Sequence, residues 1–242
     1  MKKINLGLIG ASGKMGLAIR DGLGALGFIP FVAVSSKNCA EFKYSYKSVT
    51  DILPEIAKKV DVWIEFSSVE SLILFLSQFK KTNLKVVSGT TGLSKAQFKK
   101  LQNFSKKSAV FWSSNMSPGL WALRQSLKSL SLISDFQFSI EETHHLEKKD
   151  NPSGTALTLQ KDLEKIIGRK LKTPVGYRRP NVFGVHKITA QSKSEILNFE
   201  HIALNRAVFA QGALKAAAFL VKKKQGFYSM EDLNQRKTIK KI

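Results

Sequence analysis

The 242-residue chain has a single cysteine, Cys39, so it cannot form an intramolecular disulfide. No histidine and carboxylate spacing around that cysteine is typical of a zinc site, and we predict no metal. Long apolar runs are also missing, since none approaches the roughly 18 residues that a membrane span needs. The run Ile4–Ile9 is too short for a signal peptide. These absences predict a cytoplasmic protein that neither depends on disulfides nor enters a membrane.

Acidic residues are scarce, with 18 Asp and Glu against 39 Lys and Arg, which gives a formal net charge of +21. A basic surface can bind nucleic acid through its phosphates, and it can equally attract an anionic cofactor and substrate into a cleft. A third interpretation is a solvated, lysine-rich surface. Because the lysines are spread over almost every segment and form no single basic face, we predict no specific nucleic-acid partner.

Apolar strands alternate with helical spacing through the first half of the chain. The predicted strands are residues 4–9, 31–34, 60–66, 85–88 and 109–113, and the predicted helices are 14–26, 51–59, 69–79 and 95–106. This alternation predicts an α/β domain with a parallel, doubly wound sheet.

The order of elements changes after Pro118. We predict strands at residues 135–142, 182–190 and 195–203. Helices are predicted at residues 120–132, 213–224 and 229–233, and another helix follows residues 142–156 and ends at residue 167. Gly226 is expected to end the helix at 213–224. A second, α+β unit follows from this change.

Three glycines, Gly10, Gly13 and Gly16, follow the first predicted strand and stand at the opening of the first predicted helix. Glycines there allow a tight turn and the close approach of a pyrophosphate to the amides at a helix N-terminus. Ser12 occupies a position that is glycine in the strict form of the motif, so an ordinary strand-to-helix turn is the alternative.

The second strand lacks the terminal acid that usually binds the ribose hydroxyls of NAD. It ends instead in Ser35, Ser36 and Lys37. Two hydroxyls and an ammonium suit a 2′-phosphate, and Lys14 can add a second charge, so we predict NADPH in preference to NADH. A polar surface turn is the alternative.

Residues 142–156 form the densest cluster of reactive groups. A double bond that accepts hydride must also gain a proton, and His144 and Lys148 can deliver one. Ser153, Gly154 and Thr155 begin a predicted helix whose N-terminus can bind a carboxylate. The alternative is a solvated loop in which Ser153 only caps the helix.

The string from His144 to Ala156, His-His-x-x-Lys-x-Asp-x-Pro-Ser-Gly-Thr-Ala, resembles the signature of the 4-hydroxy-tetrahydrodipicolinate reductases, also called dihydrodipicolinate reductases. Further matches occur in the family's order at residues 10–16, 66–67, 89–92, 114–117 and 209–213. The resemblance implies a Rossmann-type parallel-sheet nucleotide domain with an inserted α+β domain for substrate binding and oligomerisation. It assigns residues 1–118 and 206–242 to the first and residues 119–205 to the second.

The resemblance also implies the reaction and its residues. The family reduces 4-hydroxy-tetrahydrodipicolinate to tetrahydrodipicolinate with NAD(P)H and loss of water, in diaminopimelate and lysine biosynthesis. By position, His144 and Lys148 are the expected catalytic residues and His145, Ser153, Gly154 and Thr155 the expected substrate-binding residues. The expected cofactor-binding residues are Gly10, Gly13, Lys14, Met15, Gly16, Ser35, Ser36, Lys37, Phe66, Gly89, Thr90, Thr91, Ser114, Asn115 and Met116.

One region departs from the family pattern. Residues 173–190 are shorter than usual and keep only the Gly-x-His motif at Gly184 and His186. The family uses this part of the chain for tetramer contacts, so we expect a homo-oligomer without fixing its size. The alternatives are a Rossmann dehydrogenase for another small amino or dicarboxylic acid and a basic nucleic-acid-binding Rossmann protein.

Overall fold

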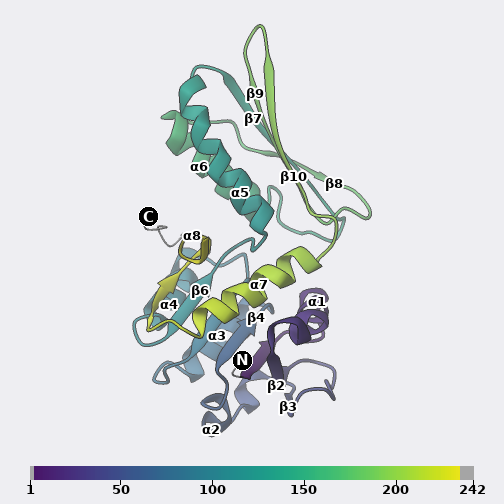
Figure 1. Cartoon of the computed structure of the whole chain (residues 1–242), viewed down its shortest axis with the longest axis vertical. Helices are drawn as coiled ribbons and strands as arrows, with labels where there is room; N and C mark the ends of the chain where they lie inside the picture. The colour runs from purple at the N-terminus through teal and green to yellow at the C-terminus, as the bar shows by residue number, and fades with distance from the viewer. Residues whose placement is uncertain (1–2, 235–242) are drawn as a thin grey trace, which may run out of the picture. The chain divides into compact units, whose positions relative to one another are not determined.

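The computed structural model describes residues 3–234, without the side chains of residues 25 and 26 (Figure 1). The chain divides into two compact units. One contains the residues up to Met116 together with those from Phe209 onward, and the other is Ser117–Val208.

The first unit is built on a seven-stranded parallel sheet in the order β11-β6-β5-β4-β1-β2-β3. Its strands are β1 (Ile4–Ile9), β2 (Phe28–Val34), β3 (Tyr44–Tyr46), β4 (Val62–Glu65), β5 (Lys85–Ser88), β6 (Ala109–Trp112) and β11 (Gly226–Tyr228). Its helical segments are α1 (Lys14–Gly22), η1 (Leu23–Leu26), η2 (Val49–Asp51), α2 (Pro54–Ala57), α3 (Val69–Gln78), α4 (Lys95–Phe104), α7 (Ala207–Leu220) and α8 (Met230–Asn234).

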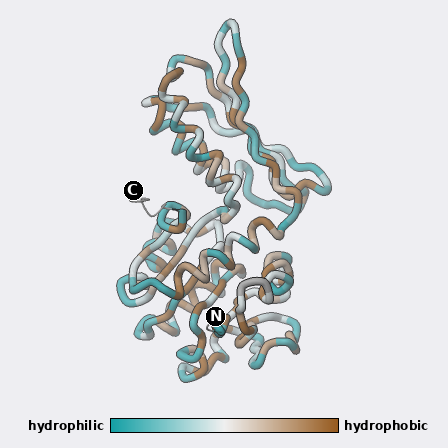
Figure 2. Tube along the Cα trace, viewed as in Figure 1, coloured by the Kyte–Doolittle hydropathy of each residue, from teal (hydrophilic) through white to brown (hydrophobic). Residues whose placement is uncertain are grey.

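The central strands of this sheet are buried on both faces, which explains why they are apolar almost without interruption. Leu6, Leu8 and Ile9 of β1 have no exposed surface. On one face, the Phe75 ring of α3 packs 5.2 Å from the Trp63 ring of β4, measured between centroids. Hydrophobic and hydrophilic stretches alternate along the chain in both units (Figure 2).

The order of strands reverses beside β1, since β2 lies on one side of it and β4 on the other. In open parallel sheets, ligands bind at the carboxyl ends of the strands at such a switch point. The glycine turn follows β1 directly, so the fold places it at this point.

The second unit has a four-stranded mixed sheet in the order β10-β9-β7-β8. Its strands are β7 (Gln137–His144), β8 (Val175–Arg178), β9 (Val185–Gln191) and β10 (Ile196–Ile202), and its helical segments are α5 (Pro118–Ser126), η3 (Leu127–Ile133) and α6 (Gly154–Ile167). Residues alternate between buried and half-buried along β9. One sheet face therefore packs against the helices, with Ile140, Ile188 and Leu163 among the core residues.

The predicted α/β fold with a parallel sheet is confirmed, and three short strands, β3, β8 and β11, escaped prediction. The helix expected at residues 51–59 is only η2 and α2, because Pro54 starts a new turn at the first position of α2. The helix expected from residue 213 starts at Ala207 and includes Gly212, where a side chain would collide with the Met116 carbonyl. Gly226 begins β11 and does not end that helix, which stops at Leu220.

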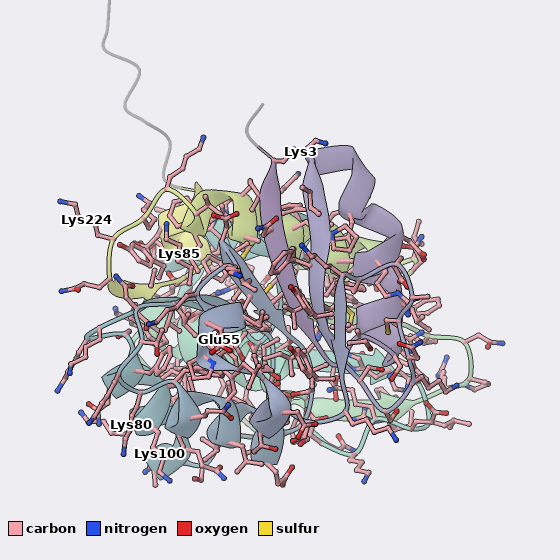
Figure 3. All side chains as sticks on the ribbon, turned by 90° about the horizontal axis from the view of Figure 1, so that it is seen from below. Lys3, Glu55, Lys80, Lys85, Lys100 and Lys224 are labelled. Atoms are coloured by element: carbon pink, nitrogen blue, oxygen red, sulfur yellow. The ribbon has the colours of Figure 1, made fainter. Side chains whose placement is uncertain are left out.

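No helix in the part of the chain that the structure describes combines the length and the apolar character needed to cross a lipid bilayer. Lysines project from separate elements of the first unit. Lys80 points outward from the turn after α3, Lys100 from α4 and Lys224 from the segment after α7 (Figure 3). This arrangement agrees with a dispersed positive charge.

Gly16 supplies a test of the glycine turn. A Cβ at Gly16 would collide with the Gly10 carbonyl and the Ala11 backbone, whereas a Cβ at the exposed Gly24 meets no atom within 4 Å. We expect Gly16→Ala to lower the free energy of unfolding by about 1–3 kcal/mol, and Gly24→Ala to change it by less than about 1 kcal/mol. Urea denaturation measures both. Equal effects of the two substitutions would contradict the close packing of this turn.

Candidate active site

The glycine turn forms a cradle at the start of α1. Gly10 has a φ of +86°, and a side chain there would collide with the Phe66 carbonyl. Gly13 is the N-cap of α1 and makes no side-chain capping bond. Lys14, Met15 and Gly16 form its first turn. The positive end of the helix dipole and the absence of side chains fit the pyrophosphate of a dinucleotide.

The residues after β2 lie beside this cradle. The hydroxyl oxygens of Ser36 and Ser12 are 3.3 Å apart. The backbone N–H of Lys37 donates to the Ser35 hydroxyl over 3.1 Å, and the Ser36 and Lys37 side chains are exposed. The nearest acid along the chain, Glu41, is engaged by Arg20. The turn therefore presents hydroxyls and an ammonium where dinucleotide folds usually hold the ribose.

A buried glutamate joins the loops after β4 and β5. Oε1 of Glu65 accepts bonds from the Ser67 backbone N–H at 2.8 Å, the Ser67 hydroxyl at 2.5 Å and the Thr90 hydroxyl at 2.8 Å. Its Oε2 accepts from the Ser88 hydroxyl at 2.6 Å. The Phe66 ring fills the place that a Gly89 side chain would take. The sequence predicted that the loops after β4 and β5 bind the cofactor, but it did not indicate Glu65, which connects them.

The loop after β6 completes this edge of the sheet. The Ser113 hydroxyl donates to the Asn115 carbonyl over 2.6 Å, and the Met116 side chain is buried. Ser114 lies within the same loop, and Thr91 is exposed in the loop after β5. The structure thus places every residue predicted to bind the cofactor in loops at the carboxyl ends of five adjacent strands, β2, β1, β4, β5 and β6, or in the first turn of α1.

In the second unit, His144 ends β7 and is buried against Glu142, with its Nδ1 in contact with Glu142 Oε2. Oε1 of Glu142 accepts bonds from the Ser153 backbone N–H at 3.1 Å and from Arg178 Nη1 at 3.0 Å. Burial opposes ionisation of Glu142, but the bonds from His144, Ser153 and Arg178 and the charge of His144 outweigh it and lower its pKa to about 2.

The loop that follows β7 carries Lys148. Its Nζ donates to Asp150 Oδ1 over 2.7 Å, and Asp150 Oδ2 accepts from the Gly154 backbone N–H at 3.2 Å. Burial raises the pKa of Asp150, but the Lys148 and Gly154 bonds outweigh it and lower that pKa overall. Ser153 caps α6 by accepting from the Ala156 N–H. The Ser153 and Gly154 amides are therefore engaged by Glu142 and Asp150, which the helix N-terminus argument did not anticipate.

Two further histidines lie near His144. The His186 ring is 5.1 Å from the His144 ring, between centroids, and the His201 ring lies 6.3 Å beyond it. Burial, followed by the charge of His144, lowers the pKa of His186 to about 3. His201 Nε2 is 2.9 Å from the Ser117 hydroxyl.

Glu142, His144 and His186 are the group of three potential metal ligands found among the described residues. The carboxylate and the His144 imidazole touch each other directly, which leaves no room for an ion between them. The Arg178 guanidinium on the same carboxylate also disfavours a cation. We therefore interpret the group as a pair formed by Glu142 and His144, with the His186 ring packed against the His144 ring.

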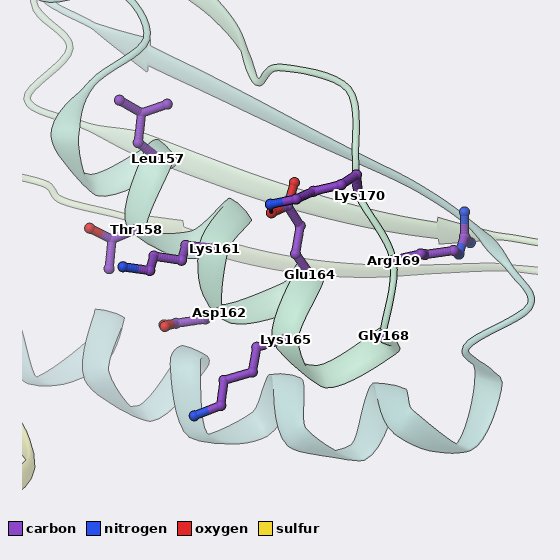
Figure 4. Close-up of a pocket in the computed structure, with 9 residues that line it drawn as sticks. All are labelled: Leu157, Thr158, Lys161, Asp162, Glu164, Lys165, Gly168, Arg169 and Lys170. Carbon is purple, nitrogen blue, oxygen red and sulfur yellow. Dashed lines mark hydrogen bonds and ion pairs between the residues drawn. The ribbon is translucent and has the colours of Figure 1, made fainter.

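A separate hollow runs along α6 (Figure 4). Two of its carboxyl groups are held by cations, since Glu164 binds Lys170 at 2.9 Å and Asp162 binds Arg124 at 2.7 Å. It includes neither His144 nor Lys148. The hollow is lined by Leu157, Thr158, Lys161, Asp162, Glu164, Lys165, Gly168, Arg169 and Lys170.

Comparison with known proteins identifies both halves of the chain. Residues 4–116 match the family model described as dihydrodipicolinate reductase, N-terminus, and residues 119–233 match the C-terminus of the same family. A 4-hydroxy-tetrahydrodipicolinate reductase of Bdellovibrio bacteriovorus is 46% identical over 233 residues, which cover 96% of this chain and 97% of that protein. The Rickettsia canadensis protein of the same name is 36% identical over 245 residues, which cover 95% of this chain and 98% of that protein.

The fold agrees with these relatives. A dipicolinate-bound dihydrodipicolinate reductase from Paenisporosarcina sp. TG-14 superposes with a TM-score of 0.74 at 16% identity, over 96% of this chain and 99% of that one. The family predicted from the His144 to Ala156 string is thereby confirmed. With both of its family models matched and relatives similar over nearly its full length, the chain belongs to the 4-hydroxy-tetrahydrodipicolinate (dihydrodipicolinate) reductase family.

Proposed function

We propose that this protein reduces 4-hydroxy-tetrahydrodipicolinate to tetrahydrodipicolinate with loss of water, as a step of diaminopimelate and lysine biosynthesis. The observation that carries the proposal is the loop between β7 and α6. The His144 imidazole at the end of β7 and the Lys148 ammonium in this loop belong to one network anchored on a buried carboxylate. Membership of the family supplies the reaction.

The first unit binds the reduced nicotinamide cofactor, which supplies the hydride. The Gly10, Gly13 and Gly16 cradle with the first turn of α1 receives the pyrophosphate, and the loops that contain Phe66, residues 89–91 and residues 114–116 line the rest of the cofactor. We propose that residues 1–118 and 206–242 form the domain that binds the cofactor, and that residues 119–205 form the domain that binds the substrate.

The second unit supplies the proton and holds the dicarboxylate. Lys148 donates the proton that accompanies hydride addition, and His144 hydrogen-bonds the charge that develops in the transition state. His145, Ser153, Gly154 and Thr155 border the same loop and helix start, where they bind the substrate carboxylates. Because Lys148 already pairs with Asp150 at 2.7 Å, its ammonium is held in place before substrate arrives.

NADPH is the cofactor that we propose. Ser35, Ser36 and Lys37 offer donors for a 2′-phosphate, and this turn contains no carboxylate to accept bonds from ribose hydroxyls. NADH has no 2′-phosphate, so it would form no bond of this kind to Lys37, but it would still bind the glycine cradle through its pyrophosphate.

The uncovered face of the second sheet supports a homo-oligomer. Four large apolar residues point to that face from its two edge strands, namely Val175 (50% exposed) and Tyr177 (43%) from β8 and Ile196 (59%) and Ile202 (52%) from β10. Exposed apolar side chains occur in subunit interfaces, and here they form two pairs at the two edges of the sheet rather than one continuous patch. We expect sedimentation equilibrium to give a mass above that of one chain, and a monomer at micromolar concentration would contradict the proposal.

Charge reversal at Lys37 tests the cofactor assignment. Lys37→Glu should raise the KM for NADPH by about tenfold or more, because one charge-assisted bond is lost and repulsion replaces it, while the KM for NADH changes little. Lys47→Glu is a control at an exposed lysine just beyond β3. The rate is followed by the absorbance of reduced nicotinamide, with substrate made in place by the preceding synthase from pyruvate and aspartate semialdehyde. Equal effects on both cofactors would disprove the 2′-phosphate assignment.

The same synthase-coupled assay tests the two catalytic assignments. His144→Gln and Lys148→Ala should each lower kcat by about 10²–10⁴-fold, because each removes a group that acts on the developing charge or proton. Lys149→Ala changes the neighbouring exposed lysine and should keep near-normal turnover. Cofactor binding, followed by nicotinamide fluorescence, should be unchanged in all three variants. Near-normal kcat in either catalytic variant would remove that residue from the mechanism.

A further inference from the structure

We propose that Glu142 is the positioning residue of this site: it holds His144 in the Nδ1-protonated form and ties the Lys148 loop to the start of α6. The inference rests on the proposed function, because it assigns His144 and Lys148 to the same reaction. Glu142 itself lies beneath the loop and acts through the residues that it binds.

The strand places Glu142 in the core. Inward positions alternate along β7 through Ile140, Glu142 and His144, and the Glu142 side chain has 0% exposure. A buried carboxylate is costly unless hydrogen-bond donors surround it. Three donors from three different segments meet this requirement: the His144 ring, the Ser153 backbone N–H and the Arg178 guanidinium.

The state of Glu142 determines which ring nitrogen of His144 carries the fixed proton. An ionised carboxylate can only accept hydrogen bonds, so the Nδ1 atom that touches Oε2 must be protonated. The exchangeable position is then Nε2. It faces Gly184, where even a Cβ would come within 3.2 Å of it, so the glycine leaves space beside the reacting nitrogen.

Arg178 extends the control of Glu142 to Lys148. While Nη1 donates to Glu142, Nε of the same guanidinium donates to the Lys148 carbonyl over 3.2 Å, and Nη2 donates to the Asp150 carbonyl. The backbone from Lys148 to Asp150 is therefore linked, through Arg178, to the carboxylate that orients the imidazole. One buried group thus sets the geometry of both catalytic side chains.

Replacement by glutamine gives a sharp test, because the network dictates how the amide must lie. The position of Oε1 receives two donors, Ser153 N–H and Arg178 Nη1, so a glutamine must place its carbonyl oxygen there. Its NH₂ group then faces His144 and donates to Nδ1. In Glu142→Gln we therefore expect His144 to carry its proton on Nε2, the inverse of the wild-type arrangement.

The tautomer is read from ¹⁵N–¹H long-range correlation spectra of the imidazoles at a pH where His144 is neutral. The chain has only four histidines, and the His144→Gln spectrum identifies the signal of interest. We expect protonated Nδ1 in the wild type and protonated Nε2 in Glu142→Gln. An unprotonated Nδ1 in the wild type, or the same tautomer in both proteins, would overturn the proposal.

Kinetics separate positioning from packing. Glu142→Gln should lower kcat by about 10²–10⁴-fold, with the KM for NADPH within about twofold of the wild type. Glu142→Asp keeps the charge and should recover at least tenfold of that loss, whereas a role in packing alone would favour the isosteric glutamine over the shorter aspartate. Glu164→Gln, which changes a carboxylate bound to Lys170 and the Leu171 N–H, is the matched control and should leave kcat unchanged.

The imidazole spectra and the kinetics together distinguish a failure of this proposal from a failure of the proposed function. A wild-type spectrum with protonated Nδ1 in a protein that fails to oxidise NADPH would contradict the function and leave the tautomer assignment standing. If Glu142→Gln does not fold, as judged by its circular dichroism, then the wild-type spectrum and the kcat of Glu142→Asp decide. A wild-type Nδ1 without a proton, or an aspartate variant as inactive as His144→Gln, would refute the proposal.

Discussion

The cost of burying a carboxyl group organises the candidate site of each unit. Glu142 in the second unit has donors from a histidine, a backbone amide and an arginine, and each donor belongs to a different segment. Removing one partner of such a buried cluster leaves the others unsatisfied, so the segments are held in one arrangement. The loop that carries Lys148 and the start of α6 owe their positions to this requirement.

Glu65 plays a comparable structural part in the first unit. Its two oxygens collect four bonds from three residues, Ser67, Ser88 and Thr90, which lie at the ends of neighbouring strands or just after them. The Phe66 and Gly89 loops are consequently connected beneath the surface that we assign to the cofactor. In both units a buried glutamate thus lies at or near the end of a strand, and the residues with proposed ligand contacts lie close to it in the sequence or in the adjoining loops.

Apolar runs and helical spacing predicted the parallel sheet and a change of architecture after Pro118, because apolar spacing reports burial directly. The glycines at 10, 13 and 16 predicted the turn after β1. The short edge strands β3 and β11 were not predicted, because a pattern over only three residues does not distinguish a strand from a loop. The extent of α7 was misjudged at Gly212, where the glycine is required by contact with the Met116 backbone and not by a helix end.

The site was predictable in its reactive groups and not in its supports. His144 and Lys148 stand out because their chemistry is rare in a loop, while Glu142 and Arg178 take their importance from contacts over 36 residues of sequence. A signal was present, because Glu142 falls at a core position between Ile140 and His144, and a carboxylate there requires partners. Only the fold identifies those partners, and it shows that two of them are the Ser153 amide and Arg178.

Isotope tracing shows whether this protein transfers hydride from the reduced cofactor to the cyclic dicarboxylate. NADPH deuterated at the transferable position of its nicotinamide is supplied with synthase-generated substrate, and the product is analysed by mass spectrometry. We expect tetrahydrodipicolinate that carries one deuterium, formed only when the protein is present. Product without deuterium, or deuterium retained wholly on the oxidised cofactor whichever face is labelled, would contradict this transfer.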